Sequence, residues 1–527
     1  MNKLIQTAWF WPLLLFGVIF ALYGGHLHNE YIADDHEFLL GTHKARFQSA
    51  TDFFISPHGH HYIPLYYWTN ISLFETFAGN VAAQRFLILL LFFGNAWLLY
   101  SLYRKLAGNH PATGAAALLF VVHPMNADML VAVSNIFLLV YGLFILLTFH
   151  LVCDESLQER SPKLGTMTAC VSYILGLMTY DNGMLFPGVL FLYFWLKRKF
   201  SCRKSVLRSL PFGIISLVYF AAWCFFVSSS GNSLTYFKEL GLTVPVWFAT
   251  LGKLISWYIS NLFYPHNIVY LNELRPIQHQ IAGWNLLLFV SIAGIAYVVV
   301  RHWGRSLKSF LLLWFCIDFI ILLPGSLGHH EFGIVIEHHW FYLSSMAFYL
   351  LLTILLLELR PTALAHAGKT AFIVLLCWCL IQSKYTLAIS RTEIGYARYW
   401  LSVTPHNMMA LRTLGDYYVY KATPKDFDRA VAYYREILDT SSYNPAQVYD
   451  WIGNAYWFKR DYRRAEDYYH KSLTVTPTST TCSNLAELYM RLNELDLARK
   501  YFLQALLLDP HDPRAKKHLQ SSIGNLQ

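Results

Sequence analysis

The sequence predicts an all-α protein in which a polytopic membrane helix bundle of about eleven spans is followed by a soluble α-solenoid. Three observations predict this fold class. The chain is 55% hydrophobic and 17% aromatic with only 14% charged residues, whereas a soluble domain carries about 25% charge. Apolar runs long enough to cross a bilayer recur along residues 1–390. After about Lys384 the composition becomes that of a soluble protein, and the sequence repeats itself.

The predicted spans are residues 8–24, 86–103, 114–122, 131–152, 167–180, 184–196, 210–227, 284–300, 310–323, 340–357 and 371–381. We expect the first span to be retained, because it lacks the basic leader and small-residue cleavage site of a signal peptide. Residues 244–263 are less apolar and contain Lys253 and Asn261. We therefore expect a re-entrant or interfacial segment there.

The net charge of +9 lies largely in short loops between the spans. These loops contain Arg104, Lys105, Lys197, Arg198, Lys199, Arg203, Lys204, Arg208, Arg301, Arg305 and Lys308. Such loops mark the cytoplasmic side of a membrane protein, so we expect no nucleic-acid partner. The N-terminus is then cytoplasmic and the C-terminus lies outside. The compact loops favour a bacterial inner membrane, with a periplasmic active face, over the endoplasmic reticulum.

With the basic loops inside, the acidic and histidine-rich clusters all fall on the outer side. These clusters contain Asp34, Asp35, His36 and Glu37; His58, His60 and His61; His123 and Asp128; Asp181; and Glu337, His338 and His339. Residues 29–84 form an unusually long outer loop, in which 35–47 and 62–77 are predicted to be amphipathic interfacial helices. Any chemistry is therefore expected at the outer face.

Residues 391–527 form a separate domain with an internal repeat. Gly453, Ala465 and Pro477 in one copy correspond to Ala486, Ala498 and Pro510 in the next, while the first copy, 411–437, is blurred. A period of about 34 residues, with small residues where helices touch and a closing proline, is the tetratricopeptide pattern. About three such repeats bury a continuous core and present a groove for an extended peptide.

Taken together, the chain resembles the transmembrane-and-tetratricopeptide O-mannosyltransferases and their bacterial relatives, within the GT-C class of polyprenyl-phosphate-sugar glycosyltransferases. Residues 31–37 resemble the outer-loop motif with the catalytic aspartate, and 119–128 resemble an FxxHPxxxE pattern with Asp128 at its acidic position. Residues 176–182 resemble an xxxSKE turn with Asp181 at the acidic position, and 337–343 resemble ERYLYLP. The chain departs from the family where His338 replaces an arginine and where YRP reads Tyr62-Ile63-Pro64.

The resemblance implies an inverting glycosyltransferase that moves a monosaccharide from a polyprenyl-phosphate carrier to a hydroxyl, such as a Ser or Thr of a protein bound by the repeats. The acceptor hydroxyl needs a general base, and Asp34 or Asp35 is the candidate, with Asp35 slightly favoured as the base or as a positioning residue. Asp34 could instead cap a juxtamembrane helix. The sugar stays open between mannose, as in the family, and another lipid-linked sugar such as arabinose.

The departing phosphate requires cations and hydrogen-bond donors around it. The predicted substrate-binding residues are Glu37, Arg46, His61, Arg85, His123, Asp128, Asp181, Arg275, Glu337, His338 and His339. Arg85 could instead be a snorkelling anchor at the end of a span, and His123 with Asp128 could be structural.

The histidines could also hold Zn or Mn, but no segment has a recognised ligand spacing. We therefore expect no metal or other cofactor, and prefer hydrogen bonding to sugar or phosphate. The eight cysteines form no CxxC motif and predict no disulfide framework.

Two rival functions are a transporter or flippase for a lipid-linked sugar and a membrane-anchored scaffold. The spans lack the half-repeat symmetry that is typical of transporters. A scaffold would not need so many spans or clustered outer acids.

Overall fold

The computed structural model describes residues 9–32, 35–39, 52–55, 62–77, 79–227, 243–269, 272–274, 280–327, 334–336, 338–359, 362–441, 444–510 and 512–524. The chain divides into two compact units, the first ending at Glu393 and the second continuing from Ile394. This division lies next to the predicted domain boundary between residues 390 and 391.

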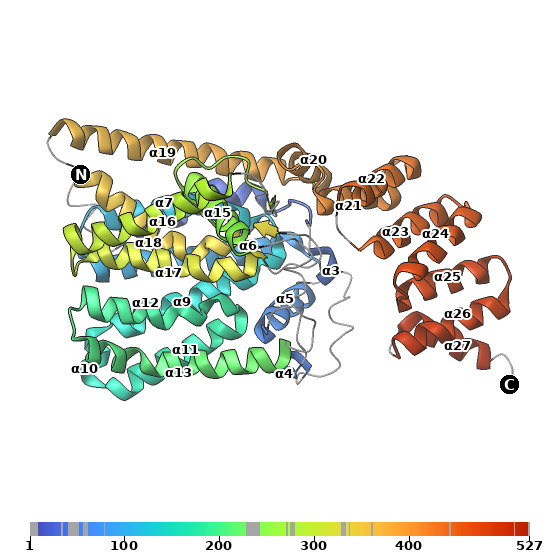
Figure 1. The fold of residues 1–527 in the computed structure, drawn as a ribbon, viewed down its shortest axis with the longest axis horizontal. Coiled ribbons are helices and arrows are strands. Elements are labelled where there is room, and N and C mark those ends of the chain that lie inside the picture. The colour runs from blue at the N-terminus through green and yellow to red at the C-terminus, as the bar shows by residue number, and fades with distance from the viewer. Residues whose placement is uncertain are drawn as a thin grey trace. The chain divides into compact units, whose positions relative to one another are not determined.

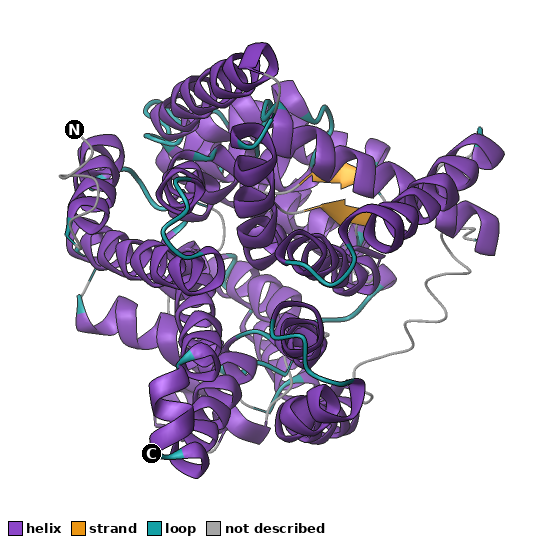
Figure 2. Ribbon diagram, turned by 90° about the vertical axis from the view of Figure 1, so that its left-hand side faces the viewer, coloured by secondary structure: helices purple, strands orange, loops and turns teal. Residues whose placement is uncertain are grey.

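The first unit is a bundle whose long helices run side by side (Figures 1 and 2). Its helices are α2 (Phe10–Tyr23), α3 (Asp35–Leu39), α4 (Asp52–Ile55), α5 (Pro64–Thr76), α6 (Val81–Ala107), α7 (Ala112–Val122), α8 (Pro124–Ala127), α9 (Ile136–Cys153), α10 (Glu155–Arg160), α11 (Pro162–Thr179), α12 (Phe186–Leu192), α13 (Cys202–Val227), α15 (Val244–Phe263), α16 (Ile281–Tyr297), α17 (Leu307–Leu327), α18 (Tyr342–Leu357) and α19 (Thr362–Ile389). Short helical turns are η1 (Gly24–His26), η3 (Asp128–Leu130), η4 (Val133–Asn135), η5 (Asp181–Leu185), η6 (Tyr193–Lys197), η8 (Val298–Trp303) and η9 (His338–Phe341).

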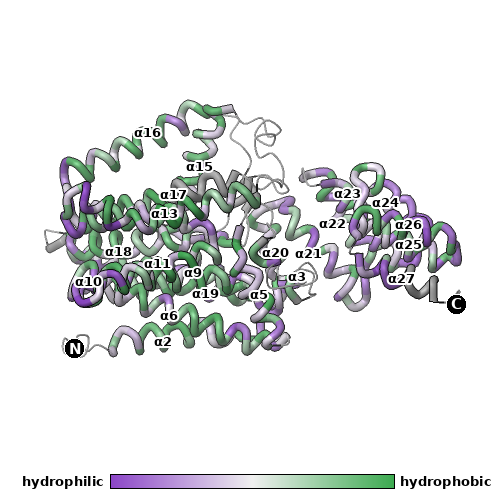
Figure 3. The backbone as a smooth tube through the Cα atoms, turned by 90° about the horizontal axis from the view of Figure 1, so that it is seen from below, coloured by the Kyte–Doolittle hydropathy of each residue, from purple (hydrophilic) through white to green (hydrophobic). Residues whose placement is uncertain are grey.

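Every predicted span falls on a helix. Within the described residues, five helical segments are long and apolar enough to cross a membrane: Val81–Ala107, Val133–Cys153, Cys202–Phe226, Ile281–Trp303 and Leu364–Ile389. Shorter apolar helices cover Phe10–His26, Ala112–Val122, Leu307–Ile317 and Tyr342–Leu357. The segment Ile281–Trp303 has a mean hydropathy of 2.0, yet only 6% of it is buried within the protein. Such an apolar exposed surface (Figure 3) is expected to face lipid.

Helix α15 is the segment that was expected to be re-entrant or interfacial, and it is one unbroken helix. Its C-terminal end packs against the middle of two long helices: the Phe263 ring lies 5.2 Å from that of Phe348 in α18, and the Pro265 carbonyl accepts a hydrogen bond from Trp378 in α19. The chain then continues to β1 (Asn272–Leu274), which pairs antiparallel with β2 (Ile334–Ile336). Apart from this small ribbon, the described fold is helical.

The basic loops gather at one end of the bundle, where α10 lies in Figure 1. Salt bridges connect loops of different helix pairs here: Lys105 lies 3.0 Å from Asp154, and Lys308 lies 2.6 Å from Glu358. Helices α3, α4 and α5 lie at the opposite end (Figure 1). The basic and acidic motifs are thus segregated to opposite ends, as the sequence predicts.

The second unit is an array of antiparallel helix pairs. Its helices are α20 (Glu393–Val403), α21 (Met408–Asp416) with the π-helical turn η10 (Tyr417–Lys421), α22 (Phe427–Thr440), α23 (Pro445–Phe458), α24 (Tyr462–Val475), α25 (Ser479–Arg491), α26 (Leu495–Leu508) and α27 (Pro513–Gly524). The pairs α21–α22, α23–α24 and α25–α26 correspond to the three predicted repeats, including the blurred first copy. Each pair contributes to a continuous apolar core.

The repeat spacing follows from a close contact inside each pair. A Cβ on Gly415 would lie 2.3 Å from the Tyr434 ring, and one on Gly453 would lie 2.6 Å from the Tyr469 ring. In both pairs a glycine therefore lets the facing tyrosine pack directly against the helix backbone. In the third pair, Ala486 occupies the corresponding position on α25 and is fully buried.

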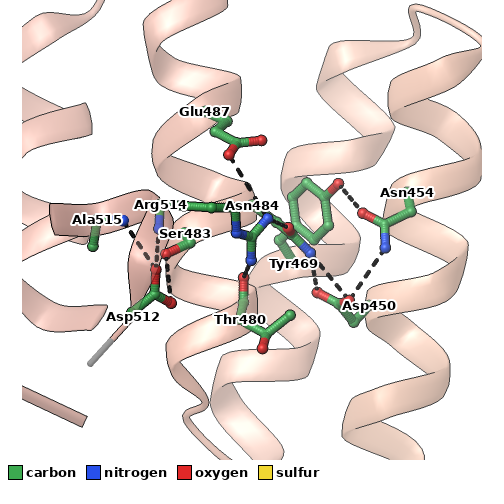
Figure 4. Close-up of polar contacts among 10 residues, drawn as sticks. All are labelled: Asp450, Asn454, Tyr469, Thr480, Ser483, Asn484, Glu487, Asp512, Arg514 and Ala515. Carbon is green, nitrogen blue, oxygen red and sulfur yellow. Dashed lines mark hydrogen bonds and ion pairs between the residues drawn. The ribbon is translucent and has the colours of Figure 1, made fainter. Parts of the chain in front are cut away.

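The second and third repeats are joined by a buried polar network (Figure 4). The Asp450 carboxylate accepts hydrogen bonds from the Asn484 amide at 3.0 and 3.1 Å and from the Asn454 amide at 3.3 Å. Arg514 of α27 donates to the Asn484 side-chain oxygen at 2.7 Å. Burial raises the pKa of Asp450 above its usual range, although these hydrogen bonds oppose the increase.

Replacing Gly142 tests the packing of the membrane unit. A Cβ at this position would lie 2.4 Å from the Tyr342 ring and 2.6 Å from the Asn95 side-chain oxygen. We expect Gly142→Ala to destabilise the protein by about 1–3 kcal/mol through overpacking. Gly94→Ala is the matched control, because its Cβ would meet its nearest neighbour at 3.8 Å. Thermal unfolding of the two purified variants checks this, and equal melting temperatures would contradict the packing.

The raised pKa of Asp450 gives a pH-dependent prediction. Because the folded state holds this proton more tightly than the unfolded state, the contribution of Asp450 to stability falls as pH rises from its unfolded pKa of about 3.9 to its folded pKa. Asp450→Asn removes this titration. Melting of the repeat unit should therefore depend less on pH in that window in the variant than in the parent. Parallel profiles for the two proteins would show that Asp450 titrates normally.

Candidate functional site

Asp35, at the start of α3, is fully buried. Its carboxylate accepts hydrogen bonds from the backbone N–H groups of Ile32 at 3.1 Å, Val133 at 3.0 Å and Ser134 at 2.7 Å. A carboxylate with both oxygens bound to N–H groups in a dry site is held strongly, and it has no exposed oxygen that could accept a proton from an acceptor hydroxyl. The structure therefore shows Asp35 holding backbone N–H groups, and its catalytic role stays a prediction.

Arg85, in the first turns of α6, is buried as well, with 5% of its surface exposed. Its guanidinium donates to the carbonyl oxygens of Leu130 at 2.9 Å, Val131 at 3.1 and 3.2 Å, and Glu30 at 2.8 Å. The planar fork of arginine suits several carbonyls at once. Arg85 is thus neither a snorkelling anchor nor, in this arrangement, a ligand for the donor phosphate, because backbone carbonyls engage both of its terminal nitrogens.

Asp35 and Arg85 together hold residues 128–135, which we call the 128–135 segment. The segment consists of two 3₁₀ turns, η3 and η4, so regular helix bonds do not satisfy all of its backbone groups. Irregular backbone at membrane depth is tolerated only where protein or water satisfies it. The Asp35 carboxylate accepts from N–H groups at the start of η4. The Arg85 guanidinium donates to C=O groups at the end of η3. Both residues thereby hold the acidic loop, by which we mean the described residues 29–32 and 35–39, beside this segment.

His123 lies between α7 and α8 and is fully buried. Its Nδ1 accepts a hydrogen bond from the Met125 N–H at 3.3 Å, and its Nε2 is 3.3 Å from the Leu262 carbonyl. Since a carbonyl only accepts, the proton must lie on Nε2 and the imidazole is neutral. His123 therefore caps α8 and ties it to the end of α15, which supports the structural alternative.

Asp128 and His338 are brought to the same region from distant parts of the chain. Asp128 begins η3, His338 begins η9, and these two turns pack against each other. Both side chains are buried. His338 Nδ1 lies 3.0 Å from the Val269 carbonyl, and its ring lies 4.6 Å from Trp257. The residue that replaces the family arginine is thus packed into the end of the bundle.

Asp181 begins η5 and is nearly buried. The preceding residue, Tyr180, packs edge-on against Phe137 and Tyr141 of α9, with ring centroids 5.5 and 5.4 Å apart. Tyr66 of α5 also packs against Phe137, with ring centroids 4.7 Å apart. These ring contacts place the Asp181 turn beside the outer loop and the start of α9, which follows the 128–135 segment.

Several predicted site residues lie outside the described residues: Asp34, Arg46, His61, Arg275 and Glu337, with the side chains of Glu37 and His339. Their roles stay predictions. Within the described part of the chain, no three His, Cys, Asp or Glu side chains gather as a possible metal site.

Sequence reasoning missed a group of contacts between the acidic loop and the end of the membrane unit. Glu30 accepts a hydrogen bond from the Glu393 N–H at 2.9 Å, across 363 positions of sequence, and His36 Nε2 lies 2.7 Å from Glu393 Oε1. Tyr31 donates to the Gln84 side chain at 2.8 Å. The only sequence signal was the position of Glu30 and His36 beside the two aspartates.

Comparison with known proteins identifies the second unit. Models described as tetratricopeptide repeat match residues 446–479 and 480–512. These are tetratricopeptide repeats. The matches cover α23–α24 and α25–α26 with the start of the next turn. A search of curated proteins gives no match.

Two solved structures are similar at low scores. One is the Archaeoglobus fulgidus oligosaccharyltransferase tethered to an acceptor peptide, with 13% identity and a TM-score of 0.37 over 80% of this chain and 59% of that one. The other is the APC/C hetero-tetramer Cut9–Hcn1, with 13% identity and a TM-score of 0.25 over 79% of this chain and 90% of that one. The chain thus spans about three fifths of the oligosaccharyltransferase. Neither score establishes a shared fold.

Replacing Arg85 tests the anchoring of the 128–135 segment. Arg85→Lys keeps the charge, but an ammonium cannot reproduce the forked contacts to Leu130, Val131 and Glu30. We expect a loss of stability of about 1–3 kcal/mol, because buried carbonyls lose their donors. Arg203→Lys, at an exposed position, is the control. Thermal melting of both variants decides the point, and an unchanged melting temperature for Arg85→Lys would refute the anchoring role.

Proposed function

We propose that this chain is an integral-membrane inverting glycosyltransferase. It moves a monosaccharide from a polyprenyl-phosphate carrier to a hydroxyl, such as a Ser or Thr of a protein held by the tetratricopeptide repeats. The observation that carries the proposal is the convergence of the acidic loop, the 128–135 segment and the His338 turn at one end of the bundle. Three motifs that the family resemblance marks as functional are thereby assembled from distant parts of the sequence.

In this reaction the acceptor oxygen attacks the anomeric carbon while the bond to the carrier phosphate breaks, which inverts the configuration. A general base takes the hydroxyl proton, and the phosphate leaves with the bonding electrons. Asp34 is the proposed base. Asp35 engages both of its oxygens with backbone N–H groups, so the pair divides its work: Asp35 fixes the loop and Asp34 does the chemistry.

The departing carrier phosphate gains negative charge, which nearby cations stabilise. Because Arg85 binds three backbone carbonyls, this role is proposed for Arg46, Arg275 and His339. Glu37, His61 and Glu337 are proposed to bind the sugar hydroxyls. Asp128, Asp181 and His338 are proposed to line the substrate-binding site.

The second unit is proposed to bind the acceptor protein. Tyr420 and Phe458 are 48% and 39% exposed, and their rings meet edge-on at 5.2 Å. Lys425 lies over the Phe458 ring at 5.6 Å. Aromatic side chains are enriched in protein-binding surfaces relative to the rest of a protein surface. The proposed topology places the N-terminus in the cytoplasm and both the acidic loop and the repeats in the periplasm.

The proposal is tested with the full chain reconstituted in liposomes that contain polyprenyl-phosphate-linked mannose or arabinose. Proteins from cells with and without the chain serve as acceptors, and mass spectrometry detects the added sugar. We expect transfer by the parent protein and a loss of about 10²-fold or more in Asp34→Asn. The variant should melt at the parent temperature, because the substitution keeps the size of the side chain.

Asp35→Asn is the comparison variant. It should lower the melting temperature, because the amide nitrogen cannot accept one of the three N–H bonds. Full transfer by Asp34→Asn would exclude Asp34 as the base. Movement of the intact lipid-linked sugar across the bilayer without transfer would favour a flippase and overturn the proposal.

A further inference from the structure

The acidic loop has a second anchor besides the 128–135 segment. We infer that Glu393 is a positioning residue for sugar transfer, acting through Glu30 and His36 on the segment that contains Asp34. The inference rests on the proposed transferase function. It adds a residue that belongs to none of the family-like motifs and lies at the far end of the membrane unit.

Glu393 contacts residues on both sides of the aspartate pair, one through a hydrogen bond and the other through an ion pair. Its backbone N–H donates to Glu30 Oε2 at 2.9 Å, and its own Oε1 lies 2.7 Å from His36 Nε2. Glu30 precedes Asp34 in the sequence, and His36 follows Asp35 directly. One residue thus fixes the chain before and after the proposed base.

Two further hydrogen bonds hold the same part of the chain, and we call these contacts, together with those of Glu393 to Glu30 and His36, the Glu393 joint. The Glu30 N–H donates to the Arg391 carbonyl at 3.2 Å, and the Asn29 side chain donates to the Leu387 carbonyl at 3.2 Å. The loop is therefore bonded to the end of α19 and to the turn that follows it. Glu393 and Asn29 are both buried, whereas Glu30 is exposed and 29% of the His36 side chain is exposed.

The charges at the joint are arranged favourably. Glu393 is the first residue of α20, where the backbone N–H groups of a helix are unsatisfied. The Glu30 carboxylate meets one of these N–H groups and so caps the helix with a negative charge. The Glu393 carboxylate lies instead against the His36 ring, 2.7 Å from Nε2, and this contact is an ion pair when the imidazole is protonated.

The joint also explains why a carboxylate is needed at position 393. The capping bond to Glu30 uses the backbone and survives any substitution except proline. The contact with His36 uses the side-chain carboxylate, and only a carboxylate of suitable length restores it. A small displacement of a catalytic group can cost up to about 10²-fold in rate. Loss of the His36 contact should therefore slow turnover without changing donor binding.

The test compares Glu393→Ala with Glu393→Gln in the full-length protein, using the liposome assay. We expect Glu393→Ala to lower kcat roughly tenfold, with an unchanged KM for the polyprenyl-phosphate sugar. Glu393→Gln keeps the length of the side chain but removes the carboxylate that pairs with His36, so it should lose activity as Glu393→Ala does. His36→Ala should match Glu393→Ala, and the double variant should be no worse than either, because coupled residues are not additive.

A matched control is available in the repeat unit. His406 Nδ1 lies 2.8 Å from Glu436 Oε1, which is another histidine–glutamate pair, exposed and away from the acidic loop. Glu436→Ala should leave kcat unchanged. A Glu393→Ala variant with parental kcat, or an equal loss in Glu436→Ala, would overturn the positioning role.

Hydrogen exchange separates this inference from the proposed function. Amides of residues 29–39 should exchange faster in Glu393→Ala than in the parent, while amides of α9 should not change. If the parent protein transfers no sugar and this acceleration is seen, the transferase function fails and the joint remains. If the parent is active and exchange at residues 29–39 is unchanged in Glu393→Ala, the inference fails and the function remains.

Discussion

The membrane unit depends on how the backbone of the 128–135 segment is satisfied. Two 3₁₀ turns inside a helical bundle leave N–H and C=O groups that neither lipid nor helix geometry can satisfy. Asp35 accepts from the N–H groups of Val133 and Ser134, while Arg85 donates to the carbonyls of Leu130 and Val131. A buried ion of each sign thus stabilises one kind of backbone group, and the acidic loop is held in place as a result.

This arrangement changes how clustered charge in a membrane protein is interpreted. Ionisable residues near the bilayer are costly and suggest function, but here one of two neighbouring aspartates serves the scaffold. Asp35 supports the loop, which leaves Asp34 for the proposed chemistry. The same holds for cations, since Arg85 binds carbonyls that would otherwise be unsatisfied. Asp34, the proposed base, therefore lies in the sequence between Glu30 and Asp35, which hold the backbone in place.

The two units use different physical means to specify their folds. The tetratricopeptide unit repeats one local contact, an aromatic ring packed against a small residue of the preceding helix, which is a glycine in the first two pairs and Ala486 in the third. Its spacing is therefore visible as a sequence period. The membrane unit has no such repetition. Its apolar helices are identified by their hydropathy. The arrangement of its outer end depends instead on single hydrogen bonds between distant residues, such as the one between Glu30 and Glu393 across 363 positions.

The sequence alone predicted the helical class, the positions of the apolar helices, the repeats and the segregation of basic from acidic loops, because hydropathy, charge and periodicity are local properties of the chain. It also identified the motifs that meet at one end of the bundle. It could not assign roles within them. Whether Asp35 or Arg85 faces substrate or backbone depends on partners 98 and 45 positions away. Only the tertiary structure decided these roles, because burial and hydrogen-bond partners exist only once the chain has folded.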